Sequence, residues 1–545
     1  KTVSYNFYTA NKLRAEDLAP SDTPSLSKTD SYKGSDSTAI DTPNKKRSST
    51  YFYGTEPGDE IADYTLSYQA KDGSTVRSTS VNFYGDGTKR AKDATANSDA
   101  LKLSVNYRID KTATITLLTN TGSSDDIAGR QSMTYFYASA PGDEVANYTY
   151  NYLYNGIDVR STSYNFYSRT GVAGVLRAKD ATPNDYLAMT ITYRNTQTFL
   201  DGNNLSSVTT NRQSKTFFSP KLGQGDELAD YTYNYANDGS TVKTVSYNFY
   251  TSSPKRPDDL TDLSDALILS RSDSYQPDNY EGTEYDAIKT LANRRSSTYF
   301  YGAEQGEEVS NYSYNYRADG SDVRSTSVNF YTQGTSLVRA QLATPGKDPL
   351  GLSVSYRGNK AVDASLGDSD TTPADYSSRQ SRTYFVGDNP GDEIANYSYN
   401  YQKNGTGVRS TSYNFYQSAT NTIRAKDATP NDSLSITVSY RGITALQDTD
   451  TYTSVTTNRL STTFFDHHLG QGEELADYTY NYSDGVNVKT VSFNYYTGRN
   501  VRADQVNYGE AAILKKTDSY KGQDAGIIAT TKARRTTTFF YGLKP

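Results

Sequence analysis

One pattern recurs along the whole chain and limits what it can fold into. In the copy at Ala229–Tyr250, tyrosines occupy every second position of the first half, and Ser, Thr and aromatic residues fill the second half. This alternation is typical of β-strands, whose side chains point to opposite faces in turn. Asp238-Gly239 between the halves favours a tight turn, so the pattern predicts a β-hairpin. Five more copies follow the same plan: Asp63–Tyr84, Asn147–Tyr167, Asn311–Tyr331, Asn396–Tyr416 and Asp477–Tyr496.

The hairpins belong to repeats that themselves group in threes. A glycine followed by two acidic residues opens each Tyr-rich strand, at Gly58, Gly142, Gly225, Gly306, Gly391 and Gly472. Neighbouring markers are 81 to 85 residues apart, and markers three apart are separated by 247 to 249 residues. Such internal periods are typical of repeat architectures. We therefore predict one continuous array over residues 1–545, with one block at 1–242, a second at 243–488 and the start of a third at 489–545.

Each repeat also contains a second, looser hairpin. Its first strand carries a Leu-x-Leu pattern, as in Leu101–Arg108, and its second begins Arg-x-Ser-x-Thr, as at Arg130. The segments between these strands are rich in Asp, Ser, Thr and Gly, which predicts exposed loops. Four such segments are 109–128, 195–210, 359–378 and 442–458.

Composition narrows the class of protein. Tyr accounts for 51 of 545 residues although apolar residues are only 34%, so tyrosines are expected to supply much of the buried surface. The absence of Cys excludes disulfides and thiolate metal sites and is compatible with any compartment. A net charge of −6 does not indicate a nucleic-acid partner, and no apolar run is long enough for a membrane span. The first residue is Lys1 rather than Met, it lies inside a strand that matches Lys243–Tyr250, and no signal peptide is visible, so we expect a processed product or part of something longer.

The fold class follows from how hairpins can be stable. A lone hairpin is marginal in water, so each must bury its aromatic face against neighbours. We predict an all-β protein of tandem β-hairpin repeats in a continuous sheet that coils into a spiral, as a solenoid or tube-like fibre. Each block of three either forms one turn or reflects a duplication. A β-propeller is the alternative, because each repeat supplies four strands.

The Tyr231-Thr-Tyr-Asn-Tyr235 strand, its Asp238-Gly239 turn and the basic return strand resemble the tyrosine–aspartate (YD, or RHS-like) repeats. The six Tyr-rich hairpins share that pattern, although Asn234 stands where the family has Asp and the period here is longer. The resemblance implies a large extracellular bacterial protein whose hairpins wind into a spiral sheet that forms shells or elongated surface structures.

The acidic pairs are the first candidates for chemistry. A catalytic pair is needed once in one cleft, whereas these recur at a fixed phase in all six repeats. We interpret them as a structural row of acids facing a row of arginines, with Ca²⁺ at some loops as an alternative. The pairs are Asp59-Glu60, Asp143-Glu144, Asp226-Glu227, Glu307-Glu308, Asp392-Glu393 and Glu473-Glu474, and the arginines are Arg47, Arg77, Arg130, Arg160, Arg295, Arg324 and Arg409.

Other candidate sites are weaker. His467-His468 has no further histidine to complete a metal site, and we place it in an exposed loop. Rows of aromatic residues are interpreted as core, with glycan binding as the alternative. N-glycosylation triplets, which chance explains in a chain rich in Asn, Ser and Thr, begin at Asn147, Asn204, Asn311, Asn396, Asn404 and Asn431.

Together these features predict no catalytic, cofactor-binding or metal-ligating residue and no enzyme activity. The expected function is that of an extracellular or cell-surface structural protein that forms a filament, stalk or surface coat by repeat stacking. A cell-surface adhesin or glycan-binding repeat protein is the alternative. The expected partners are further copies or a continuation of the same repeat chain, with glycans also considered and nucleic acid not.

Overall fold

A computed structural model provides the coordinates of the chain. The residues that the structure describes are 2–8, 13–18, 24–34, 45–54, 56–69, 72–153, 155–195, 208–221, 225–236, 238–251, 254–260, 267–276, 293–302, 305–362, 376–388, 390–418, 421–429, 432–447, 449–469, 472, 474–497, 499–507, 512–522 and 534–540.

The chain forms two compact units, Lys1–Thr232 and Tyr233–Pro545, and strand β13 (Leu228–Tyr235) spans the boundary between them. The first unit contains β1 (Thr2–Tyr8), β2 (Leu26–Lys33), β3 (Lys46–Tyr53), β4 (Ile61–Tyr68), β5 (Val76–Tyr84), β6 (Leu101–Tyr107), β7 (Arg130–Tyr137), β8 (Val145–Tyr152), β9 (Val159–Ser168), β10 (Leu176–Arg177), β11 (Tyr186–Arg194) and β12 (Arg212–Ser219).

The second unit contains β14 (Val242–Tyr250), β15 (Leu269–Tyr275), β16 (Arg294–Tyr301), β17 (Val309–Tyr316), β18 (Val323–Gln333), β19 (Ser336–Arg339), β20 (Leu350–Arg357), β21 (Arg379–Val386), β22 (Ile394–Tyr401), β23 (Val408–Gln417), β24 (Thr422–Arg424), β25 (Ser433–Arg441), β26 (Arg459–Asp466), β27 (Leu475–Tyr482), β28 (Val488–Tyr496), β29 (Leu514–Lys521) and β30 (Arg534–Phe539).

Helical structure is sparse within the described ranges. There is one short α-helix, α1 (Ser124–Ile127), and there are short 3-10 helices at Ala15–Asp17, Ala91–Asp93, Thr112–Leu117, Pro257–Asp259, Ala425–Asp427 and Ala503–Gln505. No helix in this part of the chain is long and apolar enough to cross a membrane.

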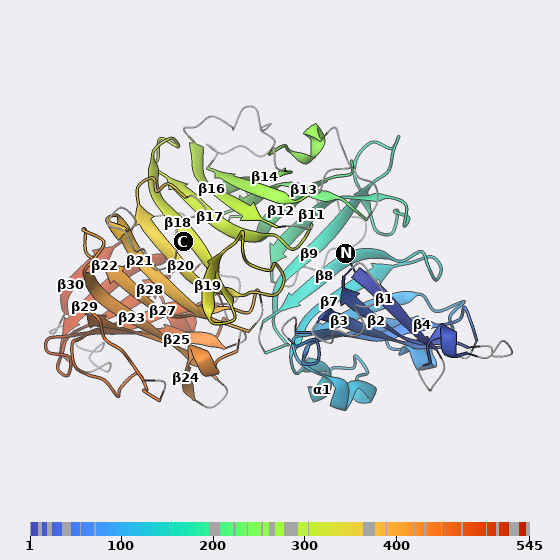
Figure 1. The fold of residues 1–545 in the computed structure, drawn as a ribbon, viewed down its shortest axis with the longest axis horizontal. Helices are drawn as coiled ribbons and strands as arrows, with labels where there is room; N and C mark the ends of the chain where they lie inside the picture. The colour runs from blue at the N-terminus through green and yellow to red at the C-terminus, as the bar shows by residue number, and fades with distance from the viewer. Residues whose placement is uncertain are drawn as a thin grey trace. The chain divides into compact units, whose positions relative to one another are not determined.

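Successive strands pair antiparallel and in order along each unit. In the first unit β3 pairs with β4, β4 with β5, β5 with β6 and β6 with β7, and the second unit repeats the scheme from β14 to β30. The short strands β10, β19 and β24 are exceptions: they pair with β9, β18 and β23, which also pair with the next long strands β11, β20 and β25. All thirty described strands belong to one antiparallel sheet, whose runs of neighbouring arrows are visible in Figure 1. The predicted all-β sheet of tandem hairpins is therefore confirmed. Among the described strands pairing continues from one repeat into the next, as from β7 into β8, so separate four-stranded propeller blades are not seen in this part of the chain.

The predicted tight turns form as the sequence indicates. Oδ1 of Asp238 accepts hydrogen bonds from the backbone N–H groups of Ser240 and Thr241 at 2.9 and 2.8 Å. Gly239, between Asp238 and Ser240, has φ of +67°, a conformation that favours glycine. Asn237, which precedes this turn, lies outside the described residues. Asp72 and Gly73 form the same turn in the first repeat.

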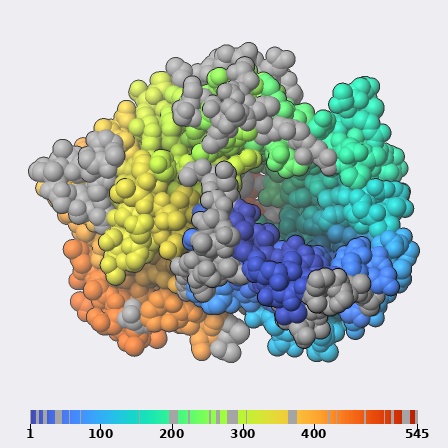
Figure 2. Space-filling model, turned by 45° about the vertical axis from the view of Figure 1, so that its right-hand side comes forward, coloured from blue at the N-terminus to red at the C-terminus, as the bar shows by residue number. Residues whose placement is uncertain are grey.

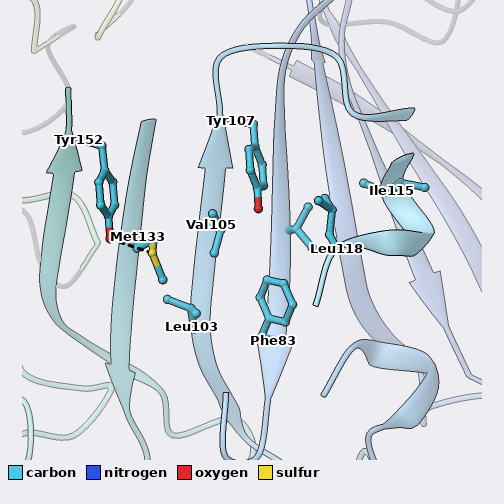
Figure 3. Close-up of a cluster of buried hydrophobic side chains, with 9 residues drawn as sticks. Phe83, Leu103, Val105, Tyr107, Ile115, Leu118, Met133 and Tyr152 are labelled. Atoms are coloured by element: carbon cyan, nitrogen blue, oxygen red, sulfur yellow. Dashed lines mark hydrogen bonds between the residues drawn. The ribbon is translucent and has the colours of Figure 1, made fainter. Parts of the chain in front are cut away.

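The two faces of the sheet differ in chemistry. One carries hydroxyl groups that pair across strands, such as Thr50 with Thr65 and Thr134 with Thr149, both at 3.0 Å between oxygens. The other carries the aromatic and aliphatic side chains. In the first unit Val81, Phe83, Leu103 and Val105 from adjacent strands are at most 1% exposed. Figure 3 shows Phe83, Leu103 and Val105 of this cluster.

The long loop of the first repeat covers this apolar face. Ile115 and Leu118, from the segment 109–128, pack against the strand residues, as Figure 3 shows. The prediction of an exposed loop is therefore wrong for these two residues. A hydrophobic sheet face needs cover, and the loop supplies it. In the second unit Leu446, Tyr452 and Val455 from segment 442–458 do the same. The N-terminal strands, dark blue in Figure 2, reach the surface of the first unit.

Candidate functional site

A β-bulge recurs at the same place in five repeats for which the pairing is described. In the first repeat Tyr51 pairs with Tyr64 and Phe52 with Ala62, so Asp63 is the extra residue. A bulge turns its extra side chain away from the ladder and frees neighbouring backbone groups. The bulged residues are Asp63, Asn147, Asn311, Asn396 and Asp477.

Two side chains of the return strand bind the backbone carbonyl next to the bulge. In the first repeat the Tyr84 hydroxyl and Nδ2 of Asn82 donate to the carbonyl of Ala62 at 2.5 and 3.1 Å. In the sixth, Tyr496 and Asn494 donate to the carbonyl of Ala476 at 2.6 and 2.9 Å. The recurring Asn-Phe-Tyr sequence of the return strands, which reads Asn-Tyr-Tyr in the sixth repeat, therefore satisfies a polar group that the bulge would otherwise leave without a hydrogen bond.

An arginine from the following turn completes this arrangement, which we call the bulge centre. In the first repeat it consists of Ala62, Asp63, Asn82, Tyr84 and Arg90. Arg90 donates from Nε and Nη2 to the two carboxylate oxygens of Asp63 at 2.8 and 2.7 Å, and from Nη1 to the carbonyl of Ile115 at 2.6 Å. Arg90 is only 7% exposed. The bidentate pair thus joins the bulge to the loop that covers the apolar face.

The bulge centre exists in an acidic and an amide form. Arg502 and Asp477 repeat the bidentate pair, at 2.7 and 2.5 Å. In the fifth repeat Asn396 replaces the carboxylate, and Nη2 of Arg424 donates to its Oδ1 at 3.2 Å. Arg177 with Asn147 and Arg339 with Asn311 have the same amide form. Each guanidinium also lies near an aromatic ring, such as that of Phe493 at 4.5 Å from Arg502.

The second acid of each pair has a different structural role from the predicted one. Oε1 of Glu144 accepts the backbone N–H of Leu101, the first residue of β6, at 2.9 Å, and Oε2 accepts that of Gly142 at 2.9 Å. We call this contact the glutamate clamp. The other clamps join Glu60 to Leu26, Glu227 to Leu187, Glu308 to Leu269, Glu393 to Leu350 and Glu474 to Leu434, at 2.7 to 3.0 Å.

The prediction that these acids face arginines is therefore wrong for the second acid of each pair. The marker glycine is needed because its backbone has positive φ, as at Gly58 with +94°. Among the predicted arginines, Arg130 instead lies over the ring of Tyr152 at 4.2 Å and donates to the carbonyl of Gly156 at 2.8 Å. A cation over an aromatic ring and a turn carbonyl replaces the expected charge pair.

Burial changes the pKa of the tyrosine hydroxyls in the bulge centres. It raises the pKa of Tyr84 to about 12, and the hydrogen bond with Asn82 acts in the opposite direction. The pKa values of Tyr416 and Tyr496 are likewise raised by burial to about 12. These hydroxyls remain protonated donors across the ordinary pH range, so they are suited to holding a carbonyl rather than to exchanging protons.

Comparison with known proteins gives no family. No protein-family model matches the chain, and no curated protein sequence matches it. The geometry of the repeats is therefore the basis for any functional argument.

His467 and His468 lie in different environments. His467 is exposed, whereas His468 is half-buried, with Nδ1 bonded to Asp466 and Nε2 2.8 Å from the carbonyl of Val506. Burial acts to lower the pKa of His468, but the bonds to Asp466 and Val506 outweigh it and raise that pKa. The expectation that both histidines lie in an exposed loop is thus wrong for His468. Within the described ranges, no group of three or more His, Asp or Glu could hold a metal ion.

Most of the described glycosylation triplets belong to bulge centres. Asn147, Asn311 and Asn396 each accept a hydrogen bond from an arginine, and Asn311 is only 6% exposed. Their amides are used in packing the repeat. Asn404 lies on an exposed turn, where its Oδ1 accepts the N–H of Thr406. Asn204 and Asn431 lie outside the described residues.

The bulge centre was not predicted from the sequence, although signals for it exist. An Asn-Phe-Tyr sequence follows five of the six Tyr-rich strands, and Asn-Tyr-Tyr follows the sixth. An arginine stands 25 to 30 residues after the bulged position, as Arg502 does after Asp477 and Arg177 after Asn147. Chemically, the carboxylates of the bulge centres and clamps have their oxygens occupied by donors. They hold strands and loops in register, and this is what the arrangement is suited to do.

Proposed function

We propose that the chain is structural material: an extracellular filament, stalk or surface coat built by adding strand to strand. One observation carries this proposal. The charged and polar residues that recur in every repeat, which would be the natural candidates for catalysis, are used repeatedly for the same internal contacts. The glutamate clamp occurs in all six repeats and the bulge centre follows the same plan.

The energetic logic supports a cohesive role. Backbone pairing runs from strand to strand, and each repeat adds a stacked aromatic pair such as Tyr135 on Tyr148, with ring centroids 4.6 Å apart. Stability in such arrays is approximately a sum over repeats and their interfaces, so length can be added without a new core. The resemblance to YD repeats supports the same proposal and an extracellular location.

Electron microscopy tests this proposal. Negative-stain images of the concentrated chain are expected to show elongated assemblies whose length increases with protein concentration. Single particles of constant size at every concentration would contradict the proposal. A hydrolase or transferase activity that disappears when one repeat alone is altered would contradict it as well.

One observation favours a second candidate, a glycan-binding adhesin. Tyr53, Tyr137 and Tyr301 occupy the same position in three repeats and are 50%, 38% and 42% exposed. Exposed aromatic rings are able to stack on sugars. A glycan array separates the two candidates: saturable binding that is lost in the Tyr53→Ser, Tyr137→Ser and Tyr301→Ser triple variant would favour the adhesin.

A further inference from the structure

A second β-bulge occurs at the start of the return strand in the five Tyr-rich hairpins for which the pairing is described, and a basic residue occupies it. In the fourth repeat Asn315 pairs with Ser325 and Tyr316 with Val323, so Arg324 is the extra residue. A bulge redirects the side chain of its extra residue. The basic residues at these bulges, all of them exposed, are Arg77, Arg160, Arg324, Arg409 and Lys489.

The neighbouring strand places a second basic residue beside the first. Arg441, the last residue of β25, lies opposite Ser410, which follows Arg409 in β23. Opposite residues of an antiparallel pair have Cα atoms about 4.5–5.5 Å apart, so the two guanidinium groups start from adjacent positions. The second unit repeats this arrangement three times along one margin of its strands. We call this the basic margin, and its pairs are Arg324 with Arg357, Arg409 with Arg441 and Lys489 with Lys521.

The fold makes little use of these charges. The side chains of Arg409, Arg441 and Lys489 are exposed and form no hydrogen bond or ion pair within the part of the chain that the structure describes. The turn at 402–407 contains no acidic residue, and both oxygens of Asp484 in the sixth repeat accept hydrogen bonds within their own turn. Like charges at adjacent strand positions disfavour folding. Their repetition without an internal partner therefore points to an anionic ligand.

Uncharged hydroxyl groups continue from the basic margin along the same face of the sheet. Ser439 stands two residues before Arg441 in β25, and its Oγ lies 2.9 Å from the Oγ of Ser412. Ser492 and Ser519 repeat this contact in the sixth repeat at 2.8 Å. Such hydroxyls both donate and accept hydrogen bonds. A sugar acid offers the complementary groups, because it combines an anionic group with several hydroxyls.

We propose that the basic margin of the second unit binds a linear acidic polysaccharide. Its carboxylate or sulfate groups lie against the basic pairs, and its hydroxyls bond to the Ser side chains beside them. Arg324 and Arg409 are four strand steps apart, which is roughly 19 Å at about 4.8 Å per strand. A long polysaccharide therefore contacts several pairs at once and gains affinity by multivalency. Duplex DNA fits less well, because the chain has a net charge of −6.

This site is separate from the exposed tyrosines. Tyr301 pairs with Val309 at the start of β17, whereas Arg324 lies beside the far end of that strand. The inference goes beyond the proposed structural function, since it adds a ligand that a filament or coat would hold on its surface.

The test measures binding of the whole 545-residue chain to immobilised heparin and alginate, a sulfated and a carboxylated polysaccharide, with neutral dextran as the reference. Saturable binding is expected to at least one of the two acidic polymers, which also distinguishes sulfate from carboxylate. Added NaCl should weaken it, because exposed charges are screened over about 10 Å at 0.1 M salt. The Arg409→Ser, Arg441→Ser, Lys489→Ser triple variant should bind about tenfold more weakly, the sum of three exposed charge contacts.

A matched triple variant controls for the loss of net charge. Lys255→Ser, Lys347→Ser and Lys426→Ser remove three exposed cations near the opposite ends of the strands in the same unit. This variant should bind nearly as well as the unaltered chain, and so should Arg409→Lys, which keeps the charge.

Three results would overturn the inference: no saturable binding to either acidic polymer, equal loss of binding in the two triple variants when circular dichroism shows both folded, or tighter binding to duplex DNA. The outcome is separable from that of the proposed function. Elongation in the microscope without polysaccharide binding removes this site alone, and polysaccharide binding by a chain that never elongates removes the filament alone.

Discussion

The ion pair between Asp63 and Arg90 offers the sharpest test of how the repeats are held together. Arg90 is buried and donates hydrogen bonds to both oxygens of the Asp63 carboxylate. Asp63→Ala removes the anion and leaves a buried guanidinium without it, which costs about 3–5 kcal/mol. Asp63→Asn reproduces the amide form found at Asn396 and should cost about 1.5–3 kcal/mol, the value of one hydrogen bond to a charged group.

Hydrogen exchange is the suitable assay, because long repeat arrays open locally rather than in one step. In β4 and β5, Asp63→Asn should speed exchange about ten- to a hundredfold and Asp63→Ala by more than about a hundredfold, since 1.4 kcal/mol corresponds to a factor of ten. Asn396→Asp is the reciprocal variant and should slow exchange in β22 and β23. If the alanine and asparagine variants behave alike, or if exchange rises equally in all repeats, the reasoning is refuted.

Three further outcomes follow from the described contacts. Burial acts to raise the pKa of Glu60, but hydrogen bonds from the backbone of Leu26 and Gly58 outweigh it and hold that pKa below its usual 4.5. The clamp therefore stabilises β2 above pH 4.5 and is lost as the pH falls through the lowered pKa, and hydrogen exchange in β2 measured between about pH 5 and 2.5 would show this loss. Burial raises the pKa of Tyr84 and Tyr496 to about 12, so the stability that these protonated hydroxyls give the fold is complete below pH 10 and disappears as the pH rises toward 12. Absorbance at alkaline pH should therefore show a group of tyrosines that ionises only as the protein unfolds. A single transition near the usual pKa of 10.0 would contradict this. Gly156→Ala places a Cβ 2.2 Å from the carbonyl oxygen of Ile127, in the loop that covers the apolar face, and should lower stability by more than Gly171→Ala does. Gly171 has a similar positive φ but open space around it, so its variant should cost only about 1–3 kcal/mol of backbone strain, and thermal melts of the two variants would show the difference.

Sequence alone was sufficient for the strands because their signals are local. The alternation in Tyr231-Thr-Tyr-Asn-Tyr235 and the Asp238-Gly239 turn each depend on residues a few positions apart, and the observed β13 and β14 agree with them. Contacts between distant residues were harder to predict. Glu144 reaches Leu101 across 43 residues, and Asp63 meets Arg90 only because a bulge redirects it. Periodicity does not show where one strand gains an extra residue, so the purpose of the recurring acids was misassigned.

The polar composition of the long loops was also misleading. The segment 109–128 contains many Asp, Ser and Thr residues, and these indicated solvent exposure. Its few apolar residues determine its position, because Ile115 and Leu118 cover the aromatic face. Asp126 then orders the segment by accepting backbone N–H groups from Thr119 to Ser123. The overall composition of the segment reflects its many polar residues and does not reveal the few apolar residues that pack against the sheet.

The glutamate clamp has a mechanical consequence. Glu144 stands immediately before β8 and accepts a hydrogen bond from the first residue of β6, so it links two strands that are separated by β7. A force that separates an edge strand from the sheet must therefore also break a glutamate clamp to a strand two positions further into the sheet. Resistance to tearing would then rise in steps of one hairpin, and single-molecule pulling traces should show discrete plateaus rather than a smooth unzipping.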